Sequence, residues 1–224
     1  MWNIAGPLAT IQGELHWHVF DLCRVHQVMY ADLNRQVQHL DERYAHFKNL
    51  LDEQRPHVSD EEMDWFHLQE SRMNDSFLSK DLEIERLKSF SDEYSIIGLW
   101  AAAEQYLGKV FAHIEHHQTG VSIEDVRRPY RWDEFINQFN TKSITLSALN
   151  GYLDANECRV LNNTIKHAGV VNDRLAAFTY FAPHRGKKLS KVDFEMQRYV
   201  DGVFNFLGSL IESGNRLLDP SFAY

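Results

Sequence analysis

The first third of the chain repeats apolar residues at helical spacing without any residue that breaks a helix. Neither glycine nor proline occurs between Gly13 and Pro56. The apolar positions step by three or four residues, with one gap at His26, over about ten turns. They are Leu15, Val19, Leu22, Met29, Leu33, Val37, Leu40, Tyr44, Phe47 and Leu51. This pattern predicts one long helix.

A second apolar stripe follows the break at Arg55-Pro56, where the residue before proline is pushed out of the helical region. Ser59 or Asp60 can cap the new helix. The stripe contains Met63, Phe66, Met73, Phe77, Ile84, Leu87 and Phe90. The pattern from Ser59 towards His117 is compatible with one helix or with two. The two stripes predict an antiparallel helical hairpin with arms on the order of 45 Å long.

The rest of the chain alternates shorter helical patterns with polar connections. Helices are expected over residues 132–139, 144–153, 156–167 and 194–218. The sequence contains no glycine-rich phosphate loop, no βαβ alternation and no internal repeat. The predicted fold class is all-α. Residues 1–91 are expected to form the long helical hairpin, and residues 92–224 are expected to form a helical bundle.

Composition limits the classes of function. The formal net charge of −9 argues against a protein that coats nucleic acid through a general basic surface, but it permits a local basic groove. No run of about eighteen apolar residues and no basic-then-apolar leader occurs, so a cytoplasmic protein without a membrane partner is expected. Cys23 and Cys158 lack metal-ligand spacing, and we expect both to be reduced and packed.

The expected helix 156–167 carries polar side chains in a row. Arg159, Asn163 and His167 recur at four-residue steps and therefore share one face. Gly169 is placed to end the helix, and Lys166 and His167 suit the negative end of its dipole. The row has two interpretations: a polar site, or a capped amphipathic helix whose Asn and His bond only to neighbouring backbone.

The run from Arg159 to His167, followed by Gly169 and a polar turn, resembles the second motif helix of the HEPN superfamily (higher eukaryotes and prokaryotes nucleotide-binding domains). The signature of that family is an Arg, a polar residue that is often Asn, a few variable positions and a His. Asn163 and His167 match the polar and His positions. Asn162 stands where the signature has Arg, and Arg159 lies one turn earlier.

Residues 94–114 are similar to the other core helix of that family, with Glu104 where a polar residue often faces the motif. The similar segments together cover roughly residues 92–212. HEPN domains are small and all-helical, and many are metal-independent ribonucleases of toxin, antiphage and RNA-processing systems that commonly dimerise through their motif helices. The resemblance therefore implies an RNA-binding protein or endoribonuclease of a defence or toxin–antitoxin system, acting as a homodimer without metal or cofactor.

In such a ribonuclease three side chains would share the chemistry. His167 would act as general acid or base when a ribose 2′-hydroxyl attacks the adjacent phosphorus. Arg159 would stabilise charge on the phosphate oxygens as a bidentate donor, and Asn163 would hold the imidazole or the substrate. Further binding residues expected beside them are Asn162, Lys166 and Glu104.

A cationic run covers residues 184–188 and is followed by Lys191 in an otherwise acidic chain. One interpretation is a solvated turn. The other is a rim beside the polar helix that contacts phosphate through Arg185, Lys187 and Lys188.

Three histidines, His113, His116 and His117, are spaced so that one helical turn could bring them together. A zinc site needs a fourth ligand and groups that orient each imidazole, and the sequence indicates neither. We therefore expect a solvated helix end here, and no metal.

The competing hypothesis is a non-catalytic helical module for protein interaction or oligomerisation, with a degenerate HEPN motif. It is favoured by Asn162 in the Arg position, by the acidic net charge and by the long amphipathic hairpin. Because the stripes are too long for one small bundle to cover, a homodimer or a partner protein bound through helical surfaces is predicted.

Overall fold

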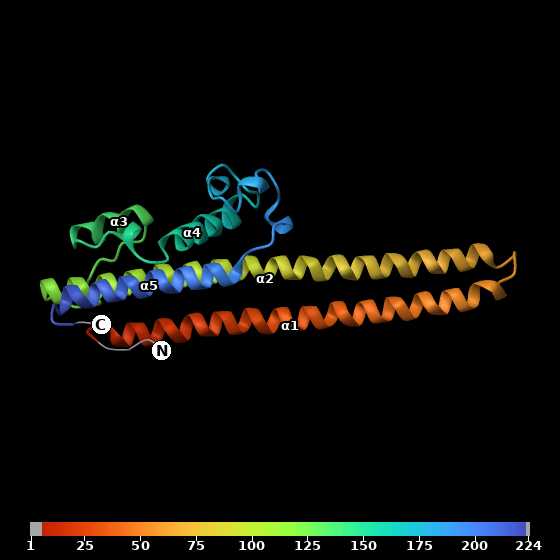
Figure 1. Ribbon diagram of the computed structural model, residues 1–224, viewed down its shortest axis with the longest axis horizontal. Coiled ribbons are helices and arrows are strands. Elements are labelled where there is room, and N and C mark those ends of the chain that lie inside the picture. Colours follow the sequence, from red (N-terminus) through yellow and green to blue (C-terminus); the bar gives the residue numbers. More distant parts are fainter. Residues whose placement is uncertain (1–5, 223–224) are drawn as a thin grey trace. The chain divides into compact units, whose positions relative to one another are not determined.

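The computed structural model describes residues 6–222, and it is all-α in that range, as predicted (Figure 1). Its helices are α1 (Ala9–Gln54), α2 (Met63–Thr119), α3 (Trp132–Thr141), α4 (Tyr152–His167) and α5 (Met196–Leu218). The stretch that could have been one helix or two is a single helix, α2. None of the helices in the described part combines the length and the apolar character needed to cross a lipid bilayer.

The chain divides into two compact units. The bundle unit contains the chain up to Arg24 and from Asp92 on, and the hairpin unit is Val25–Ser91. The predicted hairpin region, residues 1–91, ends where the hairpin unit ends but begins earlier. The start of α1 belongs to the bundle unit because Ile11, Leu15 and Val19 are buried in its core.

The hairpin unit is two antiparallel helical arms joined by a short turn at Arg55–His57. Contacts between the arms pair residues that come later in the first arm with residues that come earlier in the second. The rings of Tyr44 and Phe77 have centroids 5.1 Å apart, and nearer the turn Arg55 Nη2 lies 3.0 Å from Glu70 Oε2. The buried apolar side chains of this unit are Leu33, Leu51, Phe66 and Ile84. The predicted antiparallel hairpin is therefore confirmed.

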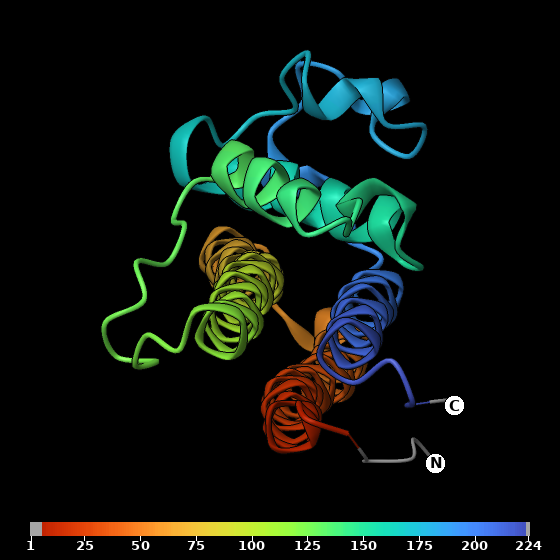
Figure 2. The ribbon, with the colours of Figure 1, turned by 90° about the vertical axis from the view of Figure 1, so that its left-hand side faces the viewer.

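The bundle unit has a continuous apolar core. Figure 2 shows α1, α2 and α5 alongside one another, with α3 and α4 lying across α2 and α5. Trp100 of α2 meets Trp132 of α3 with ring centroids 5.6 Å apart, and both rings belong to the core or pack against it. This layer of α3 and α4 holds the polar row that the sequence singled out.

α4 and α5 pack backbone against backbone. A Cβ atom added to Gly202 of α5 would lie 2.3 Å from Cβ of Asp154 of α4, which is closer than two carbon atoms can approach. Glycine at position 202 therefore permits the close contact. α4 is held in place by this contact and by an ion-pair network between the same two helices.

The prediction of a helix over residues 144–153 is wrong. Leu146–Ala148 is a single 3₁₀ turn, η2, and α4 begins at Tyr152, four residues before the expected start. Gly151 has φ of 79°, a left-handed conformation that glycine adopts without steric cost, so the chain turns there. Ile144 and Leu146 belong to this irregular connection, and both side chains are buried. Their apolar character therefore reflects burial rather than a helical period.

Candidate functional site

α4 ends where the sequence indicated. Its last residue is His167, and Gly169 follows with φ of 63°. The N–H of Gly169 donates to Thr164 O at 2.9 Å, which satisfies one of the carbonyls at the helix end. The predicted stop at Gly169 is confirmed.

Arg159 does not extend towards His167. Its Nε and Nη2 both donate to Asn156 Oδ1, at 3.1 and 2.9 Å. Its guanidinium lies over the Trp132 ring, 5.1 Å from the centroid. Asn156 precedes Arg159 by one turn, whereas His167 follows it by eight residues, about 12 Å along the helix. The structure therefore aligns the three residues of the row on α4 but does not bring Arg159 and His167 together.

The neighbouring residues Asn162 and Asn163 have different environments. Asn163 is exposed, and Asn162 is only 1% exposed. Asn162 Nδ2 donates to Asn163 Oδ1 at 3.2 Å, while Asn162 Oδ1 is buried without a hydrogen-bond partner among the described residues. Asn162, predicted as a binding residue, is buried inside the bundle unit, where its amide bonds to exposed Asn163.

Lys166 and His167 are exposed in the last turn of α4, and neither forms a hydrogen bond or ion pair with any residue between 6 and 222. The side chains of both are therefore available to a ligand.

The cationic run folds back onto the segment that follows α4. Gly186 N donates to Val171 O, Val171 N donates to Lys187 O, and Leu189 N donates to Gly169 O, at 2.9, 2.9 and 3.0 Å. An isolated antiparallel bridge joins Val170 to Lys188. Two segments that are some twenty residues apart in sequence are thereby fixed side by side at the end of α4.

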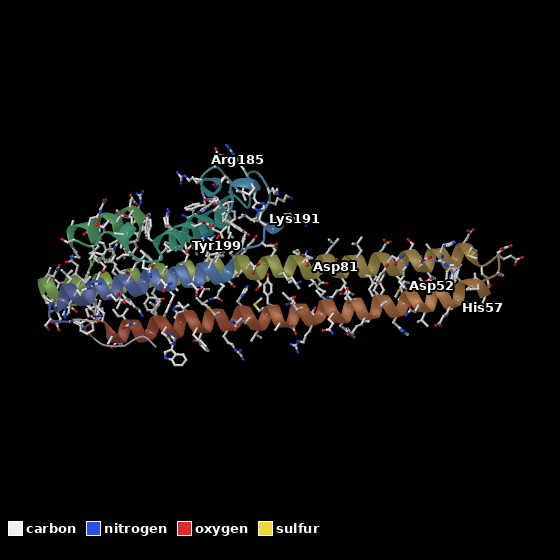
Figure 3. All side chains as sticks on the ribbon, viewed as in Figure 1. Asp52, His57, Asp81, Arg185, Lys191 and Tyr199 are labelled. Atoms are coloured by element: carbon white, nitrogen blue, oxygen red, sulfur yellow. The ribbon has the colours of Figure 1, made fainter. Side chains whose placement is uncertain are left out.

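We call the resulting group of side chains the basic surface. It consists of Lys166, His167, Arg185, Lys187 and Lys188. Arg185 and Lys191 both lie in the segment between α4 and α5 (Figure 3). Arg185 Nη2 forms an ion pair of 2.7 Å with Asp173, and both of these side chains are largely exposed. Lys187 Nζ lies 3.3 Å from His184 Nδ1, and Lys188 has no side-chain partner among the described residues.

Glu104 lies on the exposed side of α2, where its charge acts on Arg159. Its Oε1 accepts the indole N–H of Trp100 at 2.9 Å. Burial lowers the pKa of Arg159, and the charge of Glu104 opposes that shift. The charge of Glu104 therefore acts on the Arg159 part of α4.

Three residues near Arg159 were not identified from the sequence. Asn156 and Trp132 fix the Arg159 side chain, and Arg174, in the turn after α4, contributes positive charge near Arg159. Arg174 could have been noticed as one of six lysines and arginines, against a single acidic residue, between positions 166 and 191. The pairing of Trp132 with Arg159 had no sequence signal, because the two residues belong to different helices.

The three histidines at the end of α2 have different surroundings, and within residues 6–222 they do not form a metal site. His116 Nδ1 lies 2.7 Å from Val121 O, and burial together with the charge of His116 lowers the pKa of His113. Across residues 6–222, no three His, Cys, Asp or Glu side chains are arranged to hold a metal ion.

No family model matches the chain, and comparisons with curated proteins and with solved structures give no match to it. A functional assignment therefore depends on the chemistry and geometry of the residues themselves.

Proposed function

We propose that the chain is an RNA-binding protein of HEPN type, which holds the RNA backbone on its basic surface and cleaves it without metal through His167. The observation that supports this proposal best is the backbone pairing of residues 186–189 with 169–171. It sets Lys187 and Lys188 beside the turn of α4 that carries the exposed His167.

The local charge favours a polyanion as the ligand. Between positions 166 and 191 the chain has six lysines and arginines and one acidic residue, although its overall formal net charge is −9. Lysines without protein partners bind phosphate as point charges, and each neutralised phosphate releases counterions. A local cationic surface on an acidic protein can bind one strand of nucleic acid at a defined place, whereas the rest of the protein surface repels nucleic acid.

The proposed cleavage needs the ribose of RNA. An imidazole that removes the 2′-hydroxyl proton lets that oxygen attack the adjacent phosphorus, and the same imidazole can protonate the leaving 5′-oxygen. Lys166, in the last turn of α4, and Lys188, bridged to Val170, would stabilise charge on the phosphate oxygens. Such a mechanism acts on RNA and leaves DNA intact.

Binding to a short fluorescent single-stranded RNA tests the proposal. Lys187→Gln/Lys188→Gln should weaken binding about tenfold, and it should reduce the slope of log K against log salt by about one to two. The control is Lys48→Gln/Lys80→Gln, which removes the same number of positive charges from the hairpin unit, where the two lysines pair with Glu70 and Glu83. An equal loss in both double variants, or no RNA binding by the parent chain, would contradict the proposal.

A second role, self-association, is supported by the hairpin unit. This unit buries four large apolar side chains, whereas a larger number of large apolar side chains remain exposed along its two arms. The exposed ones include Val25, Val28, Met29, Leu50, Trp65, Leu68, Leu78, Leu82 and Phe90. Monomeric proteins seldom leave so many large apolar groups in water, and a second copy would supply a self-complementary surface. The homodimer predicted from the sequence is therefore retained as part of the proposal.

Light scattering of the full chain is expected to give the mass of a dimer at micromolar concentration. Leu78→Glu/Leu82→Glu should shift it to a monomer, because two charges would enter the apolar contact. The control Asp75→Gln, an exposed change on the same helix, should leave the mass unchanged. A monomeric parent chain would refute self-association and would leave RNA binding untouched.

A further inference from the structure

Residues 120–131 join α2 to α3 as a long loop (Figure 2). A cavity of about 610 Å³ lies at this loop, and its walls come from the end of α2, from the loop and from α3. Sites for small molecules typically have volumes of roughly 300–1,000 Å³. None of the residues that line this cavity belongs to the basic surface, so a ligand bound here is independent of the proposed RNA binding.

The loop is fixed along its length. At its start His116 Nδ1 lies 2.7 Å from Val121 O. Further along, the side chain of Val126 packs against the core of the bundle unit. At its end Tyr130 N donates to Glu134 Oε2 at 3.4 Å. This wall of the cavity is therefore formed before a ligand binds, which lowers the entropic cost of binding.

Two neighbouring arginines of the loop line the cavity. Arg127 and Arg128 are both exposed, and neither forms a hydrogen bond or an ion pair with any of residues 6–222. A guanidinium group carries five N–H donors in a planar fork that matches the two oxygens of a carboxylate. Both forks are therefore open to a ligand in the cavity.

Carboxylates line the same cavity, but they do not pair with these arginines in the described part of the chain. Glu115 is neutralised by Lys142, whose Nζ lies 2.5 Å from Glu115 Oε1. Glu134 accepts the N–H of Tyr130 with one of its two oxygens, and the side chain of Asp125 has no partner among residues 6–222. Groups of both signs are thus available to a ligand in one cavity.

Apolar and amide side chains complete the walls. Phe111, of which only 4% is exposed, and the half-buried Val126 supply apolar surface. Asn137 and Gln138 of α3 are exposed, and each amide offers both donors and acceptors. The cavity therefore suits a molecule that has an apolar part between polar or charged ends.

We propose that this cavity binds a zwitterion of the amino-acid type, with its carboxylate held by the two arginines and its ammonium group held by Asp125 and Glu134. A ligand with only negative charge would be repelled by the two carboxylates, and one with only positive charge would be repelled by the two arginines. A zwitterion meets an opposite charge at each end. A free amino acid and a short peptide share this chemistry and differ in the distance between their charged ends.

Isothermal titration calorimetry of the full chain tests the proposal with the free L-amino acids, added singly, and with the dipeptide leucyl-leucine. At least one of these probes should bind with a millimolar or lower dissociation constant. The carboxamide of that probe lacks the carboxylate and its N-acetyl derivative lacks the ammonium group, and each should bind about tenfold more weakly. Tighter binding of an amino acid than of leucyl-leucine identifies the free amino acid as the ligand, and the reverse order identifies a peptide.

Variants show which end of the ligand each group holds. Arg127→Gln/Arg128→Gln should lower the affinity for the zwitterion to about that for the carboxamide, and it should leave the affinity for the carboxamide unchanged. Asp125→Asn should act in the same way on the zwitterion and the N-acetyl derivative. The control is Arg216→Gln, which removes an exposed arginine without a partner among residues 6–222 from the last turn of α5. It should bind every probe as the parent chain does.

Three results would overturn the proposal. The first is that none of the zwitterions binds to the parent chain. The second is that inorganic phosphate displaces the bound zwitterion, which would mean that the arginines form a site for simple anions. The third is that the double arginine variant loses affinity for the zwitterion and for both derivatives equally, which would mean that the arginines shape the loop and do not bind a carboxylate. None of these results bears on RNA binding, which the lysine variants test separately.

Discussion

Replacing Arg198 with methionine is expected to lower the free energy of unfolding by about 3 kcal/mol, as measured by urea denaturation. Removing one partner of a buried ion pair costs about 3–5 kcal/mol, because the other charge is left uncompensated. The lower end applies here, since 31% of the Arg198 side chain is exposed, although only 7% of the Glu157 side chain is.

The expectation follows from the number of acidic groups that one arginine joins. Arg198 Nη2 lies 2.5 Å from Glu157 Oε1, Nη1 lies 2.6 Å from Asp154 Oδ1, and Nε lies 2.8 Å from Glu195 Oε2. Tyr199 Oη donates to Glu157 Oε1 at 2.8 Å. Burial and the charge of Glu157 raise the pKa of Tyr199, so its hydroxyl stays a donor. Arg198 thus joins α5 to two carboxylates of α4.

Two further variants separate this network from a general effect of losing an arginine. Arg216→Met, on the exposed last turn of α5, should change stability by less than about 0.5 kcal/mol. Glu157→Leu/Arg198→Met should recover much of the loss, because an apolar pair needs no charge compensation. If Arg198→Met costs no more than Arg216→Met, the network does not hold α4 in place.

Much of the fold follows from the sequence because local rules decide it. The apolar period over α1, the break at Pro56 and the glycine at position 169 each act within a few residues, and the structure agrees at all three. The prediction of a helix over residues 144–153 is wrong because the spacing of apolar residues that are buried by tertiary contacts imitates helical periodicity. Nothing local distinguishes a buried Leu146 in a turn from one in a helix.

The candidate site was predictable only in part. The four-residue spacing placed Arg159, Asn163 and His167 on one helix, and α4 contains all three. The direction of the Arg159 side chain depends on Trp132, which comes from another helix, and the packing of Asn162 depends on the whole bundle. The pairing of the cationic run with the segment after α4 joins distant parts of the chain, and no spacing rule reports it.

If the chain cleaves RNA as proposed, His167→Ala should reduce the cleavage rate about a hundredfold to ten-thousandfold, the usual contribution of a positioned proton-transfer residue. The His167 side chain is exposed and has no partner among residues 6–222, so the fold should lose little stability. RNA affinity should change only a few-fold, because the lysines and arginines of the surface remain. The rate is measured under single-turnover conditions with the protein in excess over a labelled RNA.

The matched control is His117→Ala, which removes an exposed histidine from the last turn of α2, as His167→Ala does from the last turn of α4. It should leave cleavage unchanged. A chelator should also leave the parent rate unchanged, because the proposed steps use only an imidazole and cationic side chains. Activity that survives His167→Ala but is lost with chelator would mean that a bound metal ion, and not His167, performs the proton transfer. Activity lost equally in both histidine variants would show that neither position is specific, and self-association through the hairpin unit would become the better account of this chain.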